Sequence, residues 1–190
     1  MKFQDFLRAW GKIEVAGQKQ PHVTEEFVLK YQSLKRKYKN YQGYLAEVFM
    51  IQILWNNQNK ELDGKYFNYP EPIKVPRFIY IDQRVRLGSG KGKEIDIYAP
   101  ASHNIWISES KWTKSPVGKD VVEKLIAQGS LIKEKNGDEQ RALMQWLFAS
   151  SGVTEGAKQI MAENGILWST KENLNALLID SGLRELPDIN

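Results

Sequence analysis

The sequence predicts an α/β fold with a central mixed β-sheet flanked by helices and an N-terminal helical segment. Apolar residues alternate with a period of two between Arg77 and Trp112, which is typical of strands. From Lys119 onwards they return at helical spacing, and a strand, a helix, a short strand and a last helix follow. This succession of elements favours a sheet covered by helices on both faces.

Residues 1–40 are expected to form a helical segment packed on or appended to a core domain of residues 41–190. The run KYQSLKRKYK from Lys30 to Lys39 is strongly basic, and it is either a solvated helix face or a DNA contact. Tyr44 to Trp55 (YLAEVFMIQILW) is apolar almost all round, which predicts a buried helix whose one charged residue is Glu47. A polar turn and three prolines follow, which predicts extended or looping chain up to residue 76.

Three antiparallel strands are expected next, as a meander. The first comprises FIYI (78–81) and VRL (85–87), the second is KEIDIYA (93–99), and the third is IWISESKW (105–112). The glycine-rich stretch GSGKG (88–92) is expected to be the turn between the first two. It lacks the Gly-Lys-Ser/Thr ending and the following helix of a phosphate-binding loop, so that interpretation is rejected.

The remaining chain predicts two strands and three helices. The helices are expected at 119–133, at 155–163 with Thr154 as N-cap and Gly165 just beyond the end, and at 173–179. The strands are expected at 142–149 and 166–168. Four tryptophans in this half of the chain are assigned to the core: Trp106, Trp112, Trp146 and Trp168.

Composition limits the chemistry that the chain can support. With 42% apolar residues the chain can bury a core, and a net charge of +4 permits a nucleic-acid partner without requiring one. The chain has no cysteine and two histidines, His22 and His103, so a bound metal needs oxygen ligands, which points to Mg²⁺ or Mn²⁺. No signal peptide or membrane span is evident, and a cytoplasmic location is expected.

The chemically informative residues lie on two neighbouring strands. Strand alternation places Glu109 and Lys111 on one face with Ile105 and Ile107. On the preceding strand Asp96 should share a face with Glu94 and Tyr98, while Ile95 and Ile97 point the other way. A short turn joins the strands, so Asp96 and Glu109 are expected to be neighbours across the sheet.

Two converging carboxylates repel each other unless a cation lies between them, and a divalent metal with oxygen ligands removes the conflict. Such a metal activates water and stabilises charge on a phosphate, and Lys111 would add a compact positive charge beside them. The plainer alternative is that Glu109 and Lys111 form a weak ion pair on a solvated strand.

Together, Glu47 in an apolar helix, Asp96 in EID and Glu109-Ser110-Lys111 in ISESKW resemble the PD-(D/E)XK, or restriction-endonuclease-like, nuclease superfamily. The resemblance extends from about Tyr41 to Asp180 and is greatest to nuclease-like domains associated with prokaryotic ATPases. It implies that Asp96, Glu109 and Glu47 bind Mg²⁺ or Mn²⁺, with the Ser110 carbonyl completing the shell. It also implies that Lys111 is the catalytic lysine.

The sequence departs from the family pattern at one position, because Glu94-Ile95 stand where the motif's proline precedes the aspartate. Glu94 is either a substitute ligand or a solvated strand residue. Gln128 resembles a polar helix residue of some branches of the superfamily. Glu47 either supports the metal or faces water at the helix edge, and burial would demand a metal or a cationic partner.

The sequence therefore predicts a metal-dependent deoxyribonuclease, a hydrolase that cleaves phosphodiester bonds in DNA. Four lysines near the motif are assigned to DNA phosphates, or else to ordinary solubility: Lys91, Lys93, Lys114 and Lys119. The alternatives are a DNA-binding or regulatory module of the same fold that does not cleave, and an interaction domain without nucleic acid. An ATPase partner or fusion and a homodimer are further expectations from the resemblance.

Overall fold

The computed structural model describes residues 21–87, 93–136 and 141–186, and the chain divides into two compact units, Met1–Tyr38 and Lys39–Asn190. Helix α2 (Pro21–Asn56) contributes to both units. In the first unit its basic stretch is largely exposed. The second unit contains every strand and the predicted site residues that the structure describes.

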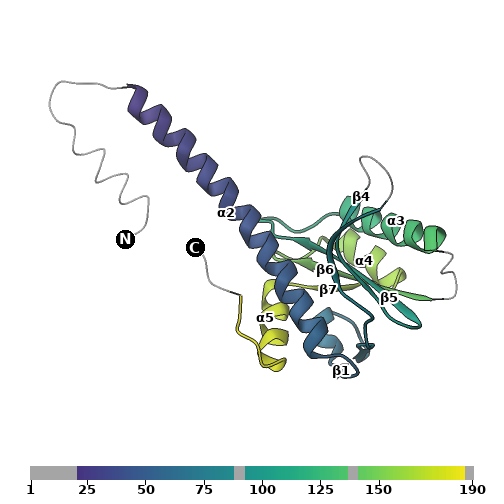
Figure 1. The fold of residues 1–190 in the computed structure, drawn as a ribbon. Helices are drawn as coiled ribbons and strands as arrows, with labels where there is room; N and C mark the ends of the chain where they lie inside the picture. The colour runs from purple at the N-terminus through teal and green to yellow at the C-terminus, as the bar shows by residue number, and fades with distance from the viewer. Residues whose placement is uncertain (1–20, 88–92, 137–140, 187–190) are drawn as a thin grey trace. The chain divides into compact units, whose positions relative to one another are not determined.

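The predicted mixed sheet is present in the second unit, with five strands in the order β3-β4-β5-β6-β7 (Figure 1). The strands are β3 (Asp82–Leu87), β4 (Lys93–Pro100), β5 (Asn104–Lys111), β6 (Ala142–Ala149) and β7 (Leu167–Ser169). The first three pair antiparallel, which confirms the expected meander. β6 and β7 then add in parallel, because helices carry the chain back across the sheet.

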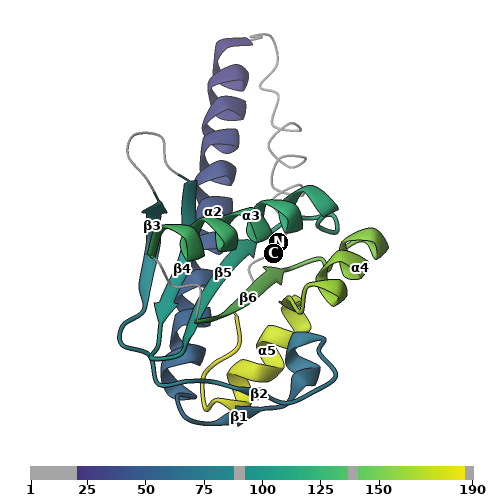
Figure 2. The same cartoon turned by 90° about the vertical axis from the view of Figure 1, so that its right-hand side faces the viewer.

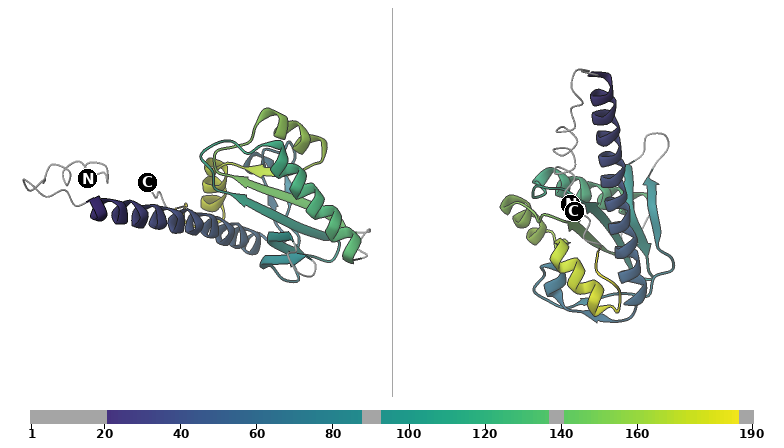
Figure 3. Two further views of the ribbon diagram at one scale, coloured as in Figure 1. Left: turned by 90° about the horizontal axis from the view of Figure 1, so that it is seen from above. Right: turned by 90° about the vertical axis from the view of Figure 1, so that its left-hand side faces the viewer.

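Helices cover both faces of the sheet (Figures 2 and 3). Helices α3 (Lys119–Asn136) and α4 (Glu155–Glu163) pack on one face, called here the α3 face. The C-terminal part of α2 and helix α5 (Lys171–Asp180) pack on the opposite face, called the α2 face. Alternation along β6 sends Trp146 and Phe148 to the α2 face and Leu147 and Ala149 to the α3 face.

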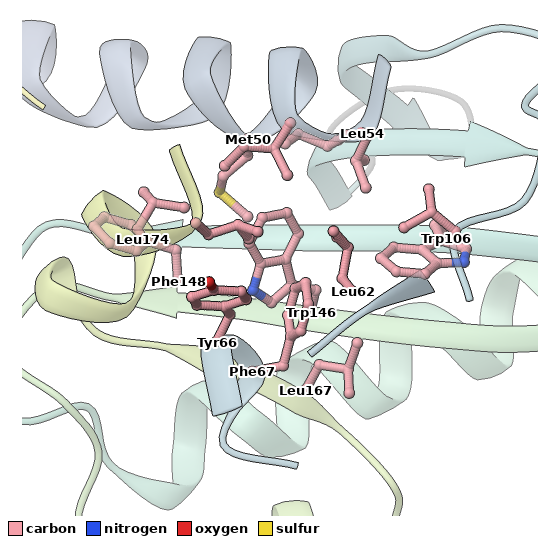
Figure 4. Close-up of a cluster of buried hydrophobic side chains, with 14 of the residues drawn as sticks. Met50, Leu54, Leu62, Tyr66, Phe67, Trp106, Trp146, Phe148, Leu167 and Leu174 are labelled. Carbon is pink, nitrogen blue, oxygen red and sulfur yellow. The ribbon is translucent and has the colours of Figure 1, made fainter. Parts of the chain in front are cut away.

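The core on the α2 face contains several buried aromatic side chains (Figure 4). Trp146 is fully buried and meets Phe67 edge to face at a centroid distance of 5.3 Å. Its indole nitrogen donates a hydrogen bond to Ser169 Oγ (2.9 Å), which in turn donates to the carbonyl of Tyr66 (2.7 Å). Trp106 is also buried here, while Trp112 and Trp168 are partly buried, in agreement with their assignment to the core.

Capping residues mark the bounds of α4 where the sequence indicates, whereas α5 begins earlier than expected. Thr154 caps α4 by accepting a hydrogen bond from the Ala157 amide, and Gly165 follows the helix with a φ of 62°. Thr170 and Asn173 form a capping box at the start of α5, two residues before the expected beginning of that helix.

Two local expectations were wrong. FIYI (78–81) is not strand: a single bridge joins Phe78 to Ala101, and β3 begins at Asp82. The prolines around that stretch limit strand pairing. The helix from Tyr44 to Trp55 is not buried all round, because both of these aromatic residues are more than two-fifths exposed.

A small sheet was not foreseen, in which β1 (Glu61–Leu62) pairs with β2 (Ile73–Lys74) around the 3-10 helix η1 (Gly64–Phe67). The turn expected at 88–92 lies outside the described residues. Among the helices that the structure describes, none is long and apolar enough to cross a membrane.

Candidate active site at the ends of β4 and β5

The β4–β5 ladder ends beside Asp96. The last paired residues are Ile97 and Ser108, and a continued ladder would bring Ile95 opposite Ser110. Instead, the Ser110 amide donates its hydrogen bond to Oδ2 of Asp96 at 2.7 Å. A side-chain carboxylate thus takes the place of a backbone carbonyl, which fixes it between the two separating strands.

Glu109 and Lys111 lie side by side on the α3 face. Their partners on β6 are Leu147 and Ala149, which belong to the core of that face. The Lys111 ammonium forms an ion pair with Oε1 of Glu109, and its Nζ lies 3.4 Å from the carbonyl oxygen of Ser110. The Glu109 side chain is 15% exposed, so this pair is more protected from solvent than an ordinary surface ion pair.

Asp96 is electrostatically coupled to its neighbours. Burial and, next, the negative charge of Glu109 raise the pKa of Asp96 to about 6, with a smaller contribution from Glu47. The Ser110 amide and the positive charge of Lys111 act in the opposite direction. The negative charge of Glu109 therefore opposes ionisation of Asp96 in the absence of a bound cation.

Glu47 is held by a different set of residues. Arg84 donates to both of its oxygens, from Nε to Oε2 at 3.0 Å and from Nη2 to Oε1 at 3.1 Å. Gln83 donates a further hydrogen bond to Oε2 at 2.6 Å. The Glu47 side chain is only 7% exposed, so the guanidinium supplies the partner that a buried carboxylate requires.

The backbone of Arg84 is unusual for a strand residue. Its φ is 57°, in the left-handed region, which costs a non-glycine residue about 1–2 kcal/mol. The β3–β4 ladder pairs Gln83 with Ile97 and Val85 with Ile95, but it omits Arg84, which lies opposite Asp96. A strained backbone conformation persists where surrounding contacts stabilise it, and the bidentate ion pair with Glu47 is such a contact for Arg84.

This local distortion overturns one prediction about the faces of β4. Ile95 and Ile97 do not point the same way: Ile95 packs in the core of the α3 face and Ile97 in the core of the α2 face. Asp96 consequently does not share a regular face with both Glu94 and Tyr98. Strict alternation fails because the pairing is interrupted on both sides of the Arg84–Asp96 position.

Divalent-metal ligands are limited to few side chains here. Among the described residues, no three acidic or histidine side chains come together closely enough to hold a metal. Asp96 accepts from the Ser110 amide, and Lys111, which is paired with Glu109, lies beside the Ser110 carbonyl, so both acids adjoin the same residue. Two carboxylates and a carbonyl suit Mg²⁺, which usually keeps several waters. The Lys111 ammonium, in contact with Glu109 and Ser110, indicates that these oxygens attract a cation.

Glu94 and Gln128, the other two candidate site residues, are joined by a hydrogen bond close to Asp96 in the sequence. Glu94 is 43% exposed and forms an ion pair with Arg86 at 3.5 Å on the neighbouring strand. Gln128, buried on α3, donates a hydrogen bond to the backbone carbonyl of Glu94 at 2.8 Å. Gln128 therefore anchors β4 two residues before Asp96, which gives it a structural role.

The structure describes the side chains of two of the four predicted DNA-binding lysines. Lys114 is exposed in the loop after β5, and Lys119 is exposed at the start of α3, where its aliphatic part lies over Gly156. Lys93 lies in β4, but its side chain is outside the described part of the structure, as is the whole of Lys91.

The sequence analysis did not identify Arg84 and Gln83 as partners of Glu47. The only signal was a glutamate inside an apolar helix, which indicated that some partner was needed.

Comparisons with known proteins gave partial similarities in structure and none in sequence. No family model and no curated protein matches the chain. The structures that it resembles include EndoMS bound to double-stranded DNA, with 22% identity and a TM-score of 0.36 over 48% of this chain and 36% of that chain.

A repair endonuclease from Pyrococcus abyssi has 22% identity and a TM-score of 0.38 over 50% of this chain and 37% of that chain. A protein of unknown function has 21% identity and a TM-score of 0.45 over 58% of this chain and 63% of that chain. The chain thus spans little more than a third of the two endonucleases. At these TM-scores the similarities do not decide the function, which has to be argued from the residues of the site.

Proposed function

We propose that this chain is a Mg²⁺- or Mn²⁺-dependent endonuclease that hydrolyses phosphodiester bonds in DNA. The observation that carries the proposal is the hydrogen bond from the Ser110 amide to Asp96, which places this acid beside the residue between Glu109 and Lys111, where the pairing of β4 and β5 ends. These are the residues that resemble the nuclease motif, and they come from strands whose pairing ends there. In this proposal Asp96, Glu109 and the Ser110 carbonyl hold the metal.

A bound divalent ion would lower the pKa of a water molecule and stabilise negative charge on a phosphate oxygen. Asp96 contributes as a carboxylate, so protonation below its pKa of about 6 should weaken metal binding. Lys111 forms an ion pair with Glu109, and we propose that it donates a hydrogen bond to the scissile phosphate or to the attacking water.

Glu47 enters this proposal as a positioning residue and not as a ligand. Both of its oxygens accept hydrogen bonds from Arg84 and one accepts a further bond from Gln83, so metal coordination would require that arrangement to break. Its negative charge still raises the pKa of Asp96, so it acts on the site electrostatically.

The phosphate contacts of four lysines remain predictions: Lys91, Lys93, Lys114 and Lys119. An ATPase partner and a homodimer remain predictions from the resemblance.

The direct test is incubation of supercoiled plasmid DNA with the protein and Mg²⁺, Mn²⁺ or EDTA. Wild-type protein should convert the plasmid to nicked or linear forms only with a divalent metal. Asp96→Ala and Lys111→Ala should each reduce the rate by at least about 100-fold, as expected for removal of a metal ligand or a group that stabilises the transition state.

Ser110→Ala is the matched control. The Ser110 hydroxyl is buried without a hydrogen-bond partner in the described structure, and only the backbone of this residue takes part in the site. The variant should cleave DNA like the wild type. Unchanged cleavage by Asp96→Ala would refute the assignment, and metal-dependent DNA binding without any product would favour the non-cleaving alternative.

A further inference from the structure

Arg84 presents a part of its guanidinium group that Glu47 does not use. The Nε and Nη2 atoms donate to the two Glu47 oxygens, whereas Nη1 makes no hydrogen bond to any residue that the structure describes. The Arg84 side chain is 48% exposed, although its carboxylate partner is almost fully buried. One edge of the guanidinium is therefore fixed to the protein, and the group still reaches solvent.

Two contacts orient the guanidinium of Arg84, and a third fixes its partner Glu47. Besides the bidentate pair, the guanidinium carbon lies 5.4 Å from the centre of the Tyr44 ring, within cation–π distance. Gln83, the preceding residue, is bonded to the same Glu47 oxygen as Arg84 Nε. Because the side chain is held at one edge and against a ring, it loses little further freedom on binding a ligand.

The location connects Arg84 to the candidate active site. Arg84 lies opposite Asp96 across the β3–β4 pair, and the negative charges of Glu47, Glu94 and Asp96 all raise its pKa. A planar guanidinium matches the geometry of a phosphate group, to which it donates charge-assisted hydrogen bonds. The alternative is that Arg84 serves only as the ion-pair partner of Glu47. In that case its exposed edge would bind no ligand.

We propose that the exposed edge of Arg84 binds a phosphodiester of the DNA backbone next to the site of Asp96 and Glu109. Glu47, Gln83 and Tyr44 then act as positioning residues that aim the guanidinium. The choice of DNA as the ligand rests on the proposed function, but the contact itself concerns binding and not cleavage. It therefore can be measured in EDTA, where no hydrolysis occurs.

The test compares two double variants of the full chain by fluorescence anisotropy with a labelled DNA duplex in EDTA. Glu47→Gln/Arg84→Gln removes the ion pair without changing the net charge, and it avoids leaving Glu47 buried and unpaired. Arg86→Gln/Glu94→Gln is the matched control, since it removes an exposed ion pair between the same two strands with the same zero change in charge. Circular dichroism and thermal melting check that both variants fold.

The Glu47/Arg84 variant should bind the duplex about tenfold more weakly at 0.1 M salt, and the slope of log K against log salt should shrink by about 0.9, as for one lost phosphate contact. The control should keep the wild-type slope. Equal slopes for the Glu47/Arg84 variant and the control would overturn the proposal, as would an absence of DNA binding by the wild type. A protein that shows the Arg84 effect but never cleaves plasmid would instead refute only the nuclease function.

Discussion

Asp96→Asn should separate the stability of this protein from its activity. The substitution removes the negative charge but keeps a side-chain oxygen that can accept the hydrogen bond from the Ser110 amide, now 2.7 Å from Asp96. The charge is costly in the absence of metal, because burial and Glu109 both oppose ionisation of Asp96. We therefore expect the variant to be more stable than the wild type in EDTA at pH 7.5, and inactive on DNA.

The size of the effect follows from the pKa of Asp96. Folding raises this pKa from 3.8 to about 6, and each unit corresponds to about 1.4 kcal/mol. At neutral pH the ionised carboxylate thus costs at most about 3 kcal/mol of folding free energy. Asparagine is itself polar and partly buried, so the net gain should be smaller, about 1–2 kcal/mol.

The difference in stability between Asp96→Asn and the wild type should depend on pH. Because the folded pKa lies above the unfolded value, the cost is fully present above pH 6, falls between about pH 6 and 4, and vanishes when both states are protonated. Urea denaturation in EDTA at pH 7.5 and at pH 4 measures the difference between variant and wild type. A variant that is less stable than the wild type at pH 7.5, or whose advantage grows as the pH falls, would refute the reasoning.

Three further substitutions test the framework of the site by thermal or urea denaturation. Gln128→Leu should destabilise the protein by about 1 kcal/mol, because it removes the hydrogen bond to the Glu94 carbonyl. The variant should also cleave DNA more slowly. An unchanged cleavage rate would leave Gln128 with a role in stability alone. Thr154→Ala should cost about 1 kcal/mol through loss of the α4 N-cap, with cleavage unaffected. Gly165→Ala should cost about 1 kcal/mol because its φ of 62° disfavours a side chain, and a neutral result would contradict the left-handed assignment.

Much of the fold could be predicted because local signals and burial agree. The strand at 142–149 and the helix at 155–163 were predicted to the residue, since an apolar run, a threonine cap and a glycine stop mark their bounds. The short strands β1 and β2 were missed because two residues each give no periodic pattern. FIYI (78–81) was wrongly assigned because its composition favours strand, whereas pairing partners decide whether a strand forms.

Only the part of the site that lies on the neighbouring strands β4 and β5 could be predicted from the sequence. A short connection between β4 and β5 brings Asp96 to the amide of Ser110, which adjoins Glu109, and this approach of the two strands could be predicted from the sequence. The partner of Glu47 did not, because Arg84 lies 37 residues away and looks like any basic residue of an exposed strand. The interrupted ladder also could not be foreseen, since it depends on a left-handed arginine held by tertiary contacts.

We propose above all that Asp96 and Glu109 share one divalent cation. A crystal of the protein grown with Mn²⁺, measured at a wavelength that reveals manganese by anomalous scattering, tests it most directly. We predict a peak at bonding distance from a carboxylate oxygen of each residue, with the Lys111 ammonium displaced from Glu109. A peak held by Glu47 instead, or no peak beside Asp96 at saturating Mn²⁺, would contradict the account.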